Sequence, residues 1–210
     1  MNRRSFHHEP EEVRRATLIR ATLDAVAERG LPGATVREVA QRALVTPGLI
    51  RRYFVSKDRM VEAAYATFVE DLTGGITEAV GSGPPVDRLE RLVRASCTDP
   101  LASPRHVAIW TAFVATVTTD PAMAQIHRDG YRAVRVLLED SIADLRRADG
   151  CPDDPDMIHR QAIAANAVID GIWLEVSLDR GTFADIDVVD LARDSILAII
   201  TRPSADRDPT

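Results

Sequence analysis

Apolar residues recur every three to four positions along most of the chain, and no stretch alternates long enough to indicate a strand. Segments rich in glycine and proline interrupt this pattern and divide it into helices. We expect helices over 13–29, 57–80, 86–97, 104–118, 121–147, 157–178 and 186–200, with two helices of about two turns each beginning at 36 and 47. The pattern therefore predicts an all-α protein of about nine helices.

Capping signals mark the starts of the two short helices. Thr35 precedes the first, and Glu38 follows three residues later, which is the spacing of a capping box in which each side chain binds the other residue's amide. Thr46 is the expected N-cap of the second, with Pro47 at the first helical position, where the missing N–H loses no hydrogen bond. Gly30 is expected to end the helix before them. Two short helices across a tight turn form the helix-turn-helix plan.

The second short helix carries a basic and aromatic face. Ile50 and Phe54 are four residues apart and can face a core, which leaves Arg51, Arg52 and Tyr53 on the other faces. A buried core helix has no need of such residues. In a helix-turn-helix domain this second helix enters the major groove of DNA, where arginine side chains contact bases or phosphates.

Length and composition exclude several classes of protein. A chain of 210 residues that is 45% apolar suits one or two small globular domains. No apolar run approaches the roughly 18 residues of a membrane helix, and the N-terminal residues lack the apolar stretch of a secretory signal. Cys97 and Cys151 have no metal or redox spacing, so we expect a reduced, cytoplasmic protein without a metal or cofactor. Catalytic motifs are also absent from the sequence, so an enzyme is not expected.

Charge is distributed unevenly along the chain. The formal net charge is −6, yet residues 1–59 hold twelve Lys and Arg against seven Asp and Glu, whereas the remainder holds fourteen against twenty-five. A basic N-terminal part joined to an acidic body favours nucleic-acid binding by the N-terminal part alone.

Residues 13–72 resemble the DNA-binding domain of the TetR family of transcriptional regulators, most clearly over ATVREVAQRALVTPGLIRRYFVSKDRMVEAAY. Two later stretches, IWTAFVATVTTDPAMAQIHRDGYRAVRVLL and AVIDGIWLEVSL, resemble the BetI-type branch, which includes choline-responsive repressors. The resemblance implies a helix-turn-helix DNA-binding domain over 1–56 and a ligand-binding and dimerisation domain over 57–202. A polar tail follows over 203–210.

The helix pattern and the resemblance together predict the residues that contact DNA. The front of the second short helix can touch thymine methyl groups, and the hydroxyl and helix amides at Thr35 can bind a phosphate. Tyr53 and Lys57 match family positions that commonly bind phosphate. The predicted DNA-binding residues are Thr35, Thr46, Pro47, Gly48, Leu49, Arg51, Arg52, Tyr53 and Lys57.

One residue departs from the family pattern. Glycine is common in the family where Leu44 stands, in the turn between the two short helices. If the backbone there is left-handed, leucine is strained by about 1 kcal/mol.

Aromatic residues and an acidic residue in the C-terminal part are candidate ligand-binding residues. Aromatic rings around a cation attract it through their π-faces, and a carboxylate adds Coulomb attraction. The competing interpretation places the same rings in the core or in a dimer interface. The predicted ligand-binding residues are Trp110, Phe113, Tyr131, Asp170 and Trp173.

These features predict a ligand-responsive DNA-binding regulator, in particular a repressor that leaves a near-palindromic operator when a small-molecule effector binds. A quaternary amine or another cation is the expected effector. The resemblance implies a homodimer in which the last two helices of each subunit form a four-helix interface. The alternative is a helical small-molecule-binding or adaptor protein without specific DNA binding, which the acidic total charge and Leu44 favour.

Overall fold

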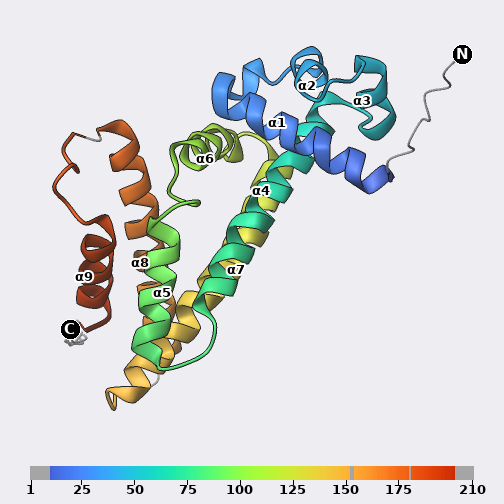
Figure 1. The fold of residues 1–210 in the computed structure, drawn as a ribbon. Coiled ribbons are helices and arrows are strands. Elements are labelled where there is room, and N and C mark those ends of the chain that lie inside the picture. The colour runs from blue at the N-terminus through green and yellow to red at the C-terminus, as the bar shows by residue number, and fades with distance from the viewer. Residues whose placement is uncertain (1–9, 152–153, 180, 202–210) are drawn as a thin grey trace, which may run out of the picture. The chain divides into compact units, whose positions relative to one another are not determined.

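The computed structural model describes residues 10–151, 154–179 and 181–201, and these residues form helices without any strand (Figure 1). The helices, in chain order, are α1 (Glu11–Gly33), α2 (Val36–Arg42), α3 (Pro47–Tyr53), α4 (Lys57–Val80), α5 (Pro85–Cys97), α6 (Pro104–Val117), α7 (Pro121–Ala148), α8 (Pro155–Leu178) and α9 (Val188–Thr201). The prediction of an all-α fold with an N-terminal helix-turn-helix is confirmed. The predicted tail over 203–210 lies outside the described residues.

The chain divides into two compact units. The first unit contains the residues up to Val69 together with Ala108–His127, and the second contains Glu70–Val107 and the residues from Arg128 onward. Helices α4, α6 and α7 therefore each contribute residues to both units. None of the helices in the described parts of the chain is long and apolar enough to cross a membrane.

The core of the first unit joins the short helices to α1 and to the first half of α4. Tyr65 is fully buried, and its ring stacks on Phe113 at a centroid separation of 4.5 Å. The Tyr65 hydroxyl also forms a 2.9 Å hydrogen bond with His127 Nδ1. The other large buried side chains of this unit include Leu18, Val26, Val39, Ile50, Met60 and Ile109.

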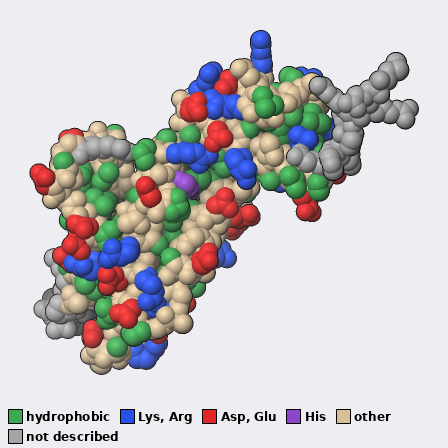
Figure 2. Space-filling view, viewed as in Figure 1, with side chains coloured by type: hydrophobic (Ala, Val, Ile, Leu, Met, Phe, Trp, Pro, Cys, Tyr) green, Lys and Arg blue, Asp and Glu red, His purple; other side chains and the backbone are tan. Residues whose placement is uncertain are grey.

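The second unit is held together by hydrogen bonds from α8 as well as by its apolar core. Trp173 on α8 donates its indole N–H to the Ser96 carbonyl on α5 over 2.7 Å. Gln161 donates to the carbonyl oxygens of Ile199 and Ile200, each over 3.0 Å, at the C-terminal end of α9. Figure 2 shows acidic and basic side chains interspersed on the visible surface of this unit, so on this face its negative charge is not gathered into one patch.

Gly30 does not end the first helix as predicted. Its φ of 65° places it in the left-handed region, and the backbone bends there before one further helical turn that contains Pro32 and ends at Gly33. The break in regular helix was located correctly, but it is a kink. The turn that follows Gly30 belongs to α1 and leads into the cap of α2.

Candidate nucleic-acid interface and ligand cavity

The N-terminus of α2 is capped by Thr35, as the sequence predicted. Thr35 has an extended backbone, and its hydroxyl oxygen accepts a 3.2 Å hydrogen bond from the Glu38 N–H. The predicted reciprocal hydrogen bond, from the Thr35 N–H to the Glu38 side chain, does not form, so that part of the prediction is wrong. The Thr35 N–H donates to the Gly33 carbonyl over 2.8 Å, and the Glu38 carboxylate is taken up by arginines.

Those arginines form a network that fixes α2 against α1. Arg42 donates from both terminal nitrogens to Glu28, over 2.9 and 2.6 Å, and from Nε to Glu38 over 2.7 Å. Arg29 pairs with the other oxygen of Glu38 at 3.1 Å. The hydrogen bond from Arg42 lowers the pKa of Glu28, and the hydrogen bonds to Glu28 and Glu38 raise the pKa of Arg42. The network therefore joins the end of α1 to both ends of the short helix α2.

The turn between α2 and α3 is left-handed at one residue. Leu44 has φ 54°, and its N–H donates to the Gln41 carbonyl over 3.2 Å. The next N–H, that of Val45, donates to the Ala40 carbonyl over 2.9 Å. These two bonds form a Schellman motif, which usually has glycine at the left-handed position. The backbone at Leu44 is thus left-handed, which is the condition under which leucine is strained there, and Leu44 is 92% exposed.

Helix α3 begins as expected, with a difference at its cap. Thr46 is the extended N-cap residue and Pro47 occupies the first turn, as predicted, although the Thr46 side chain makes no capping hydrogen bond. The backbone carbonyl of Thr46 accepts from the Leu49 N–H over 3.0 Å and starts the helix. The exposed Thr46 hydroxyl therefore lies outside the helix's own hydrogen bonding, next to the exposed residues Pro47 and Gly48.

One face of α3 is buried and the other is basic. Ile50 is 1% exposed and Phe54, at the C-cap, is 4% exposed, and the Arg15 guanidinium lies 5.3 Å above the Phe54 ring. Arg51 and Arg52 are exposed, and within the described residues neither forms an ion pair. The apolar contacts thus fix the helix while the two guanidinium groups remain available to an anionic partner.

Two further predicted DNA-binding residues, Tyr53 and Lys57, lie at the end of α3 and at the start of α4. Tyr53, the last residue of α3, is partly exposed. Lys57 begins α4 and directs its ammonium group to the Leu31 carbonyl in the last turn of α1, at 3.4 Å. A cation suits that position because helix C-terminal carbonyls are partly negative.

The predicted ligand-binding residues are distributed over both units. Trp110 and Phe113 belong to the first, where both are buried. Tyr131, Asp170 and Trp173 belong to the second, in which the Tyr131 hydroxyl donates to Asp170 over 3.3 Å. Burial raises the pKa of Asp170 to about 6, against the hydrogen bonds from Tyr131 and Asn166. The structure thus brings Tyr131 and Asp170 together, whereas the Trp173 indole N–H is occupied by Ser96.

The second unit contains a cavity that the sequence analysis missed. Its volume is about 540 Å³, and its walls come from α4, α5, the segment that leads into α6 and the first turn of α6. None of the five predicted ligand-binding residues lines it. The available signal was the presence of small residues at helical spacing, Gly75 and Ala79 on α4 and Ala95 on α5, which leave room between the two helices.

The helix-turn-helix unit and the separate cavity-bearing unit define a one-component transcriptional regulator. Residues 18–64 match the family described as "Bacterial regulatory proteins, tetR family", and residues 85–201 match "BetI-type transcriptional repressor, C-terminal". The chain belongs to the TetR family of transcriptional regulators and carries a BetI-type C-terminal domain.

Named relatives agree with this assignment. The HTH-type transcriptional regulator BetI of Burkholderia mallei (strain NCTC 10229) is 34% identical over 170 residues, which cover 80% of this chain and 83% of the relative. BetI of Burkholderia thailandensis is 33% identical over 187 residues, which cover 88% and 92%.

Solved structures share the fold. A transcriptional regulator from Pseudomonas aeruginosa PAO1 superposes with a TM-score of 0.82 at 29% identity, covering 93% of this chain and 94% of that one. A regulator from Saccharomonospora viridis, solved in complex with choline, superposes with a TM-score of 0.72 at 19% identity, covering 90% and 96%.

Proposed function

We propose that this regulator is a homodimeric repressor that holds a near-palindromic operator through α3 of each subunit and releases it when a small cationic effector binds the second unit. A single short helix reads few base pairs, so two copies related by two-fold symmetry are needed for a specific site. A regulator of this kind acts in the cytoplasm, where the DNA is.

The different use of neighbouring arginines carries the proposal. Arg29 and Arg42 form ion pairs with Glu28 and Glu38, and these pairs fix α2 on α1. Arg51 and Arg52, one helix later, are exposed and have no carboxylate partner among the described residues. Basic groups left without internal partners on a rigidly held helix suit the phosphates and base edges of a DNA groove.

An outward apolar stripe on α8 supports the dimer. Ile163, Leu174 and Leu178 are 45%, 41% and 71% exposed, and their spacing of eleven and four residues places them on one side of the helix. Leu191 on α9 is 39% exposed. A second copy of the same helices could cover this row of apolar side chains, and their removal from water would stabilise a dimer.

The effector proposal rests on the cavity in the second unit. Asp71 and Asp99 place two carboxylates on its wall, which favours a positively charged ligand. The choline complex of the S. viridis regulator supports a quaternary amine as the effector class. Because Asp71 lies on α4, and the same helix begins at Lys57 against α1, a change along α4 can reach the DNA-binding unit.

Release requires the effector to favour one state of the regulator. A ligand changes the DNA-binding equilibrium only through its different affinities for the DNA-competent and DNA-incompetent states. We expect the effector to bind the free regulator more tightly than it binds the DNA-bound regulator.

Footprinting on the DNA upstream of the regulator's own gene tests the operator proposal. The expected result is protection of two symmetric half-sites whose centres are about one helical turn, or a multiple of it, apart. Protection that requires no particular sequence, or binding of a single half-site by a monomer, would argue for a different function.

A further inference from the structure

The cavity of the second unit is elongated along two helices. On α4 its wall is formed by Asp71, Gly75 and Ala79, which are spaced four residues apart and lie on one side of the helix. A Cβ added at Gly75 would meet no atom within 4 Å, so the space beside it is open. On α5, Ala95 also lines the cavity. The central part of the cavity is therefore lined by small side chains that leave room for an apolar ligand segment.

One end of the cavity is acidic. Asp71 and Asp99 line it together with His106, whose Nδ1 lies 2.9 Å from the Ser103 hydroxyl. Burial and then the charge of Arg105 lower the pKa of His106 below its ordinary value, against the opposing effects of Asp71 and Asp99. The lowered pKa favours the neutral imidazole beside the two carboxylates. Neither aspartate forms an ion pair within the part of the chain that the structure describes.

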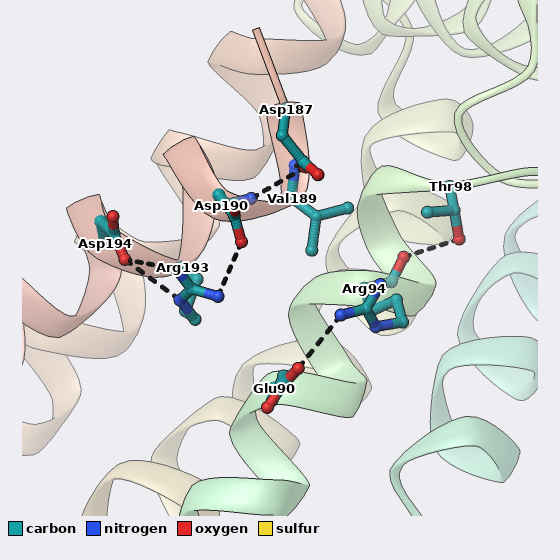
Figure 3. Close-up of polar contacts among 8 residues, drawn as sticks. All are labelled: Glu90, Arg94, Thr98, Asp187, Val189, Asp190, Arg193 and Asp194. Atoms are coloured by element: carbon teal, nitrogen blue, oxygen red, sulfur yellow. Dashed lines mark hydrogen bonds and ion pairs between the residues drawn. The ribbon is translucent and has the colours of Figure 1, made fainter.

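The other end of the cavity is basic. Arg91 lies midway along α5 and donates to the Val80 carbonyl from Nε over 2.9 Å and to the Ser82 carbonyl from Nη2 over 2.8 Å. These bonds hold the guanidinium at the C-terminal end of α4 without neutralising it, since no described carboxylate pairs with it. Arg94 differs, because its guanidinium is paired with Glu90 at 3.1 Å (Figure 3).

The two ends are too far apart for a compact ligand to reach both. Asp71 and Val80, whose carbonyl holds Arg91, are separated by about 13 Å along α4 at 1.5 Å of rise per residue. We propose that the cavity binds an elongated zwitterion, with its ammonium group at Asp71 and Asp99, its carboxylate at Arg91, and a spacer of several methylene groups along Gly75, Ala79 and Ala95. This inference rests on the proposed function and specifies the chemistry of its effector: a cation that also carries a distant negative charge.

Calorimetric titration of the full-length protein with a matched ligand series tests the proposal directly. One series is trimethylammonium carboxylates with one, three, five and seven methylene groups between the charges. The other is alkyltrimethylammonium ions of the same lengths without the carboxylate. We expect one of the longer zwitterions to bind at least about tenfold more tightly than its uncharged-tail counterpart, because a charge-assisted contact with Arg91 is added. Equal affinities of the two series, or no binding by either, would overturn the proposal.

Two neighbouring glycines provide a matched pair of variants. Gly75→Leu places a large side chain in the cavity, whereas Gly74→Leu adds the same side chain one residue away, at a position that does not line the cavity. Leucine favours helix over glycine at both positions, so both variants are expected to fold. We expect Gly75→Leu to abolish zwitterion binding and Gly74→Leu to retain it. Unchanged binding by Gly75→Leu would place the ligand elsewhere.

A separate variant tests the proposed contact between Arg91 and the ligand carboxylate. Arg91→Gln keeps a donor for the nearby carbonyls but removes the charge, so it should reduce the affinity for the long zwitterion to that of the alkyltrimethylammonium ion. A preserved preference for the zwitterion in Arg91→Gln would refute the role of Arg91.

Failure of this inference and failure of the proposed function give different results. If choline releases the regulator from DNA while the zwitterions bind no better than their counterparts, the effector-responsive repressor stands and the zwitterion does not. If the zwitterions bind as expected but the protein shows no specific DNA binding, the cavity assignment stands and the repressor does not.

Discussion

Arg42 on α2 holds Glu28 on α1 through two hydrogen bonds of 2.9 and 2.6 Å, across 14 residues of sequence. Its Nε holds Glu38 within α2 at the same time. Helix α2 is therefore fixed to α1 at Arg42, its last residue, as well as being capped at Thr35. The turn to α3 begins directly after Arg42, so this pair holds the end of α2 from which that turn starts.

Removing this pair should weaken DNA binding without removing a group that touches DNA. Arg42→Ala leaves Glu28 and Glu38 without their main partner, and we expect a lower melting temperature and a lower DNA affinity. Arg42→Lys retains the charge but not the fork geometry, so it should recover only part of the loss. Thermal denaturation and fluorescence anisotropy on the same samples check this. An unchanged melting temperature in Arg42→Ala would show that the network does not stabilise the unit.

Replacing Leu44, the left-handed residue in the turn, should raise the stability, whereas Arg42→Ala should lower it. Leu44→Gly should stabilise the protein by about 1 kcal/mol, because glycine adopts positive φ without the strain of a Cβ. Val45→Gly is the matched control: Val45 does not have positive φ, and glycine there should destabilise by increasing the entropy of the unfolded chain. Chemical denaturation of the two variants measures both effects. A less stable Leu44→Gly would contradict the strain argument.

The exposed arginines of α3 should determine the salt dependence of DNA binding. Removing one arginine that binds a phosphate reduces the slope of log affinity against log salt by about 1, so Arg51→Ala and Arg52→Ala should each lower either this slope or the preference for one base. Arg132→Ala removes the same charge from an exposed position on α7 and should leave both unchanged. If all three variants behave alike, α3 is not the DNA-contacting element.

The apolar stripe on α8 predicts the oligomeric state. Leu174→Glu places a charge in the proposed four-helix interface and should convert the dimer into a monomer, whereas Arg132→Glu, at an exposed position on α7, should not. Sedimentation equilibrium distinguishes the two outcomes. A dimer that survives Leu174→Glu would place the interface on another surface.

Asp170 should make the stability depend on pH. Its pKa is raised from 3.8 to about 6 in the folded state, so the folded protein holds this proton more tightly than the unfolded chain does. The contribution of Asp170 to the free energy of unfolding is therefore fully present below about pH 4. This contribution is lost as the pH rises through 6, which lowers the free energy of unfolding by up to about 3 kcal/mol.

Asp170→Asn should remove this decrease and be more stable than the unchanged protein at pH 7.5. Asp179→Asn is a control of opposite sign, because hydrogen bonds from Thr182 lower the pKa of Asp179 and its ionised form is the favoured one. Denaturation curves between pH 4 and 8 check both variants. A stability profile of Asp170→Asn parallel to that of the unchanged protein would show that Asp170 titrates normally.

The sequence was most informative where structure is local. The cap at Thr35 and the start of α3 at Pro47 each depend on residues within one turn of helix, and each was located correctly. The sequence also marked Leu44 as the turn residue whose backbone conformation would decide whether it is strained. The capping box failed at Glu38 because Arg29 and Arg42, brought near by tertiary packing, compete for its carboxylate.

The ligand cavity depends on which sides of two separate helices face each other, and residue types alone do not determine this. Aromatic residues drew attention to Phe113 and Trp173, whose rings are buried and already in contact with Tyr65 and Ser96. The cavity instead lies where Gly75, Ala79 and Ala95 leave space. Small residues at helical spacing are common in packed helices, so only the three-dimensional arrangement shows which of them border a cavity.

The most direct test of the account is the response of the operator complex to an effector. The purified regulator is bound to fluorescent DNA from upstream of its own gene, and choline is then titrated into the complex, followed by the long trimethylammonium carboxylate. The account predicts sequence-specific binding that the effector reverses, with Gly75→Leu bound to DNA but insensitive to the effector. Specific binding that persists at saturating concentrations of both compounds, or no specific binding at low salt, would contradict it.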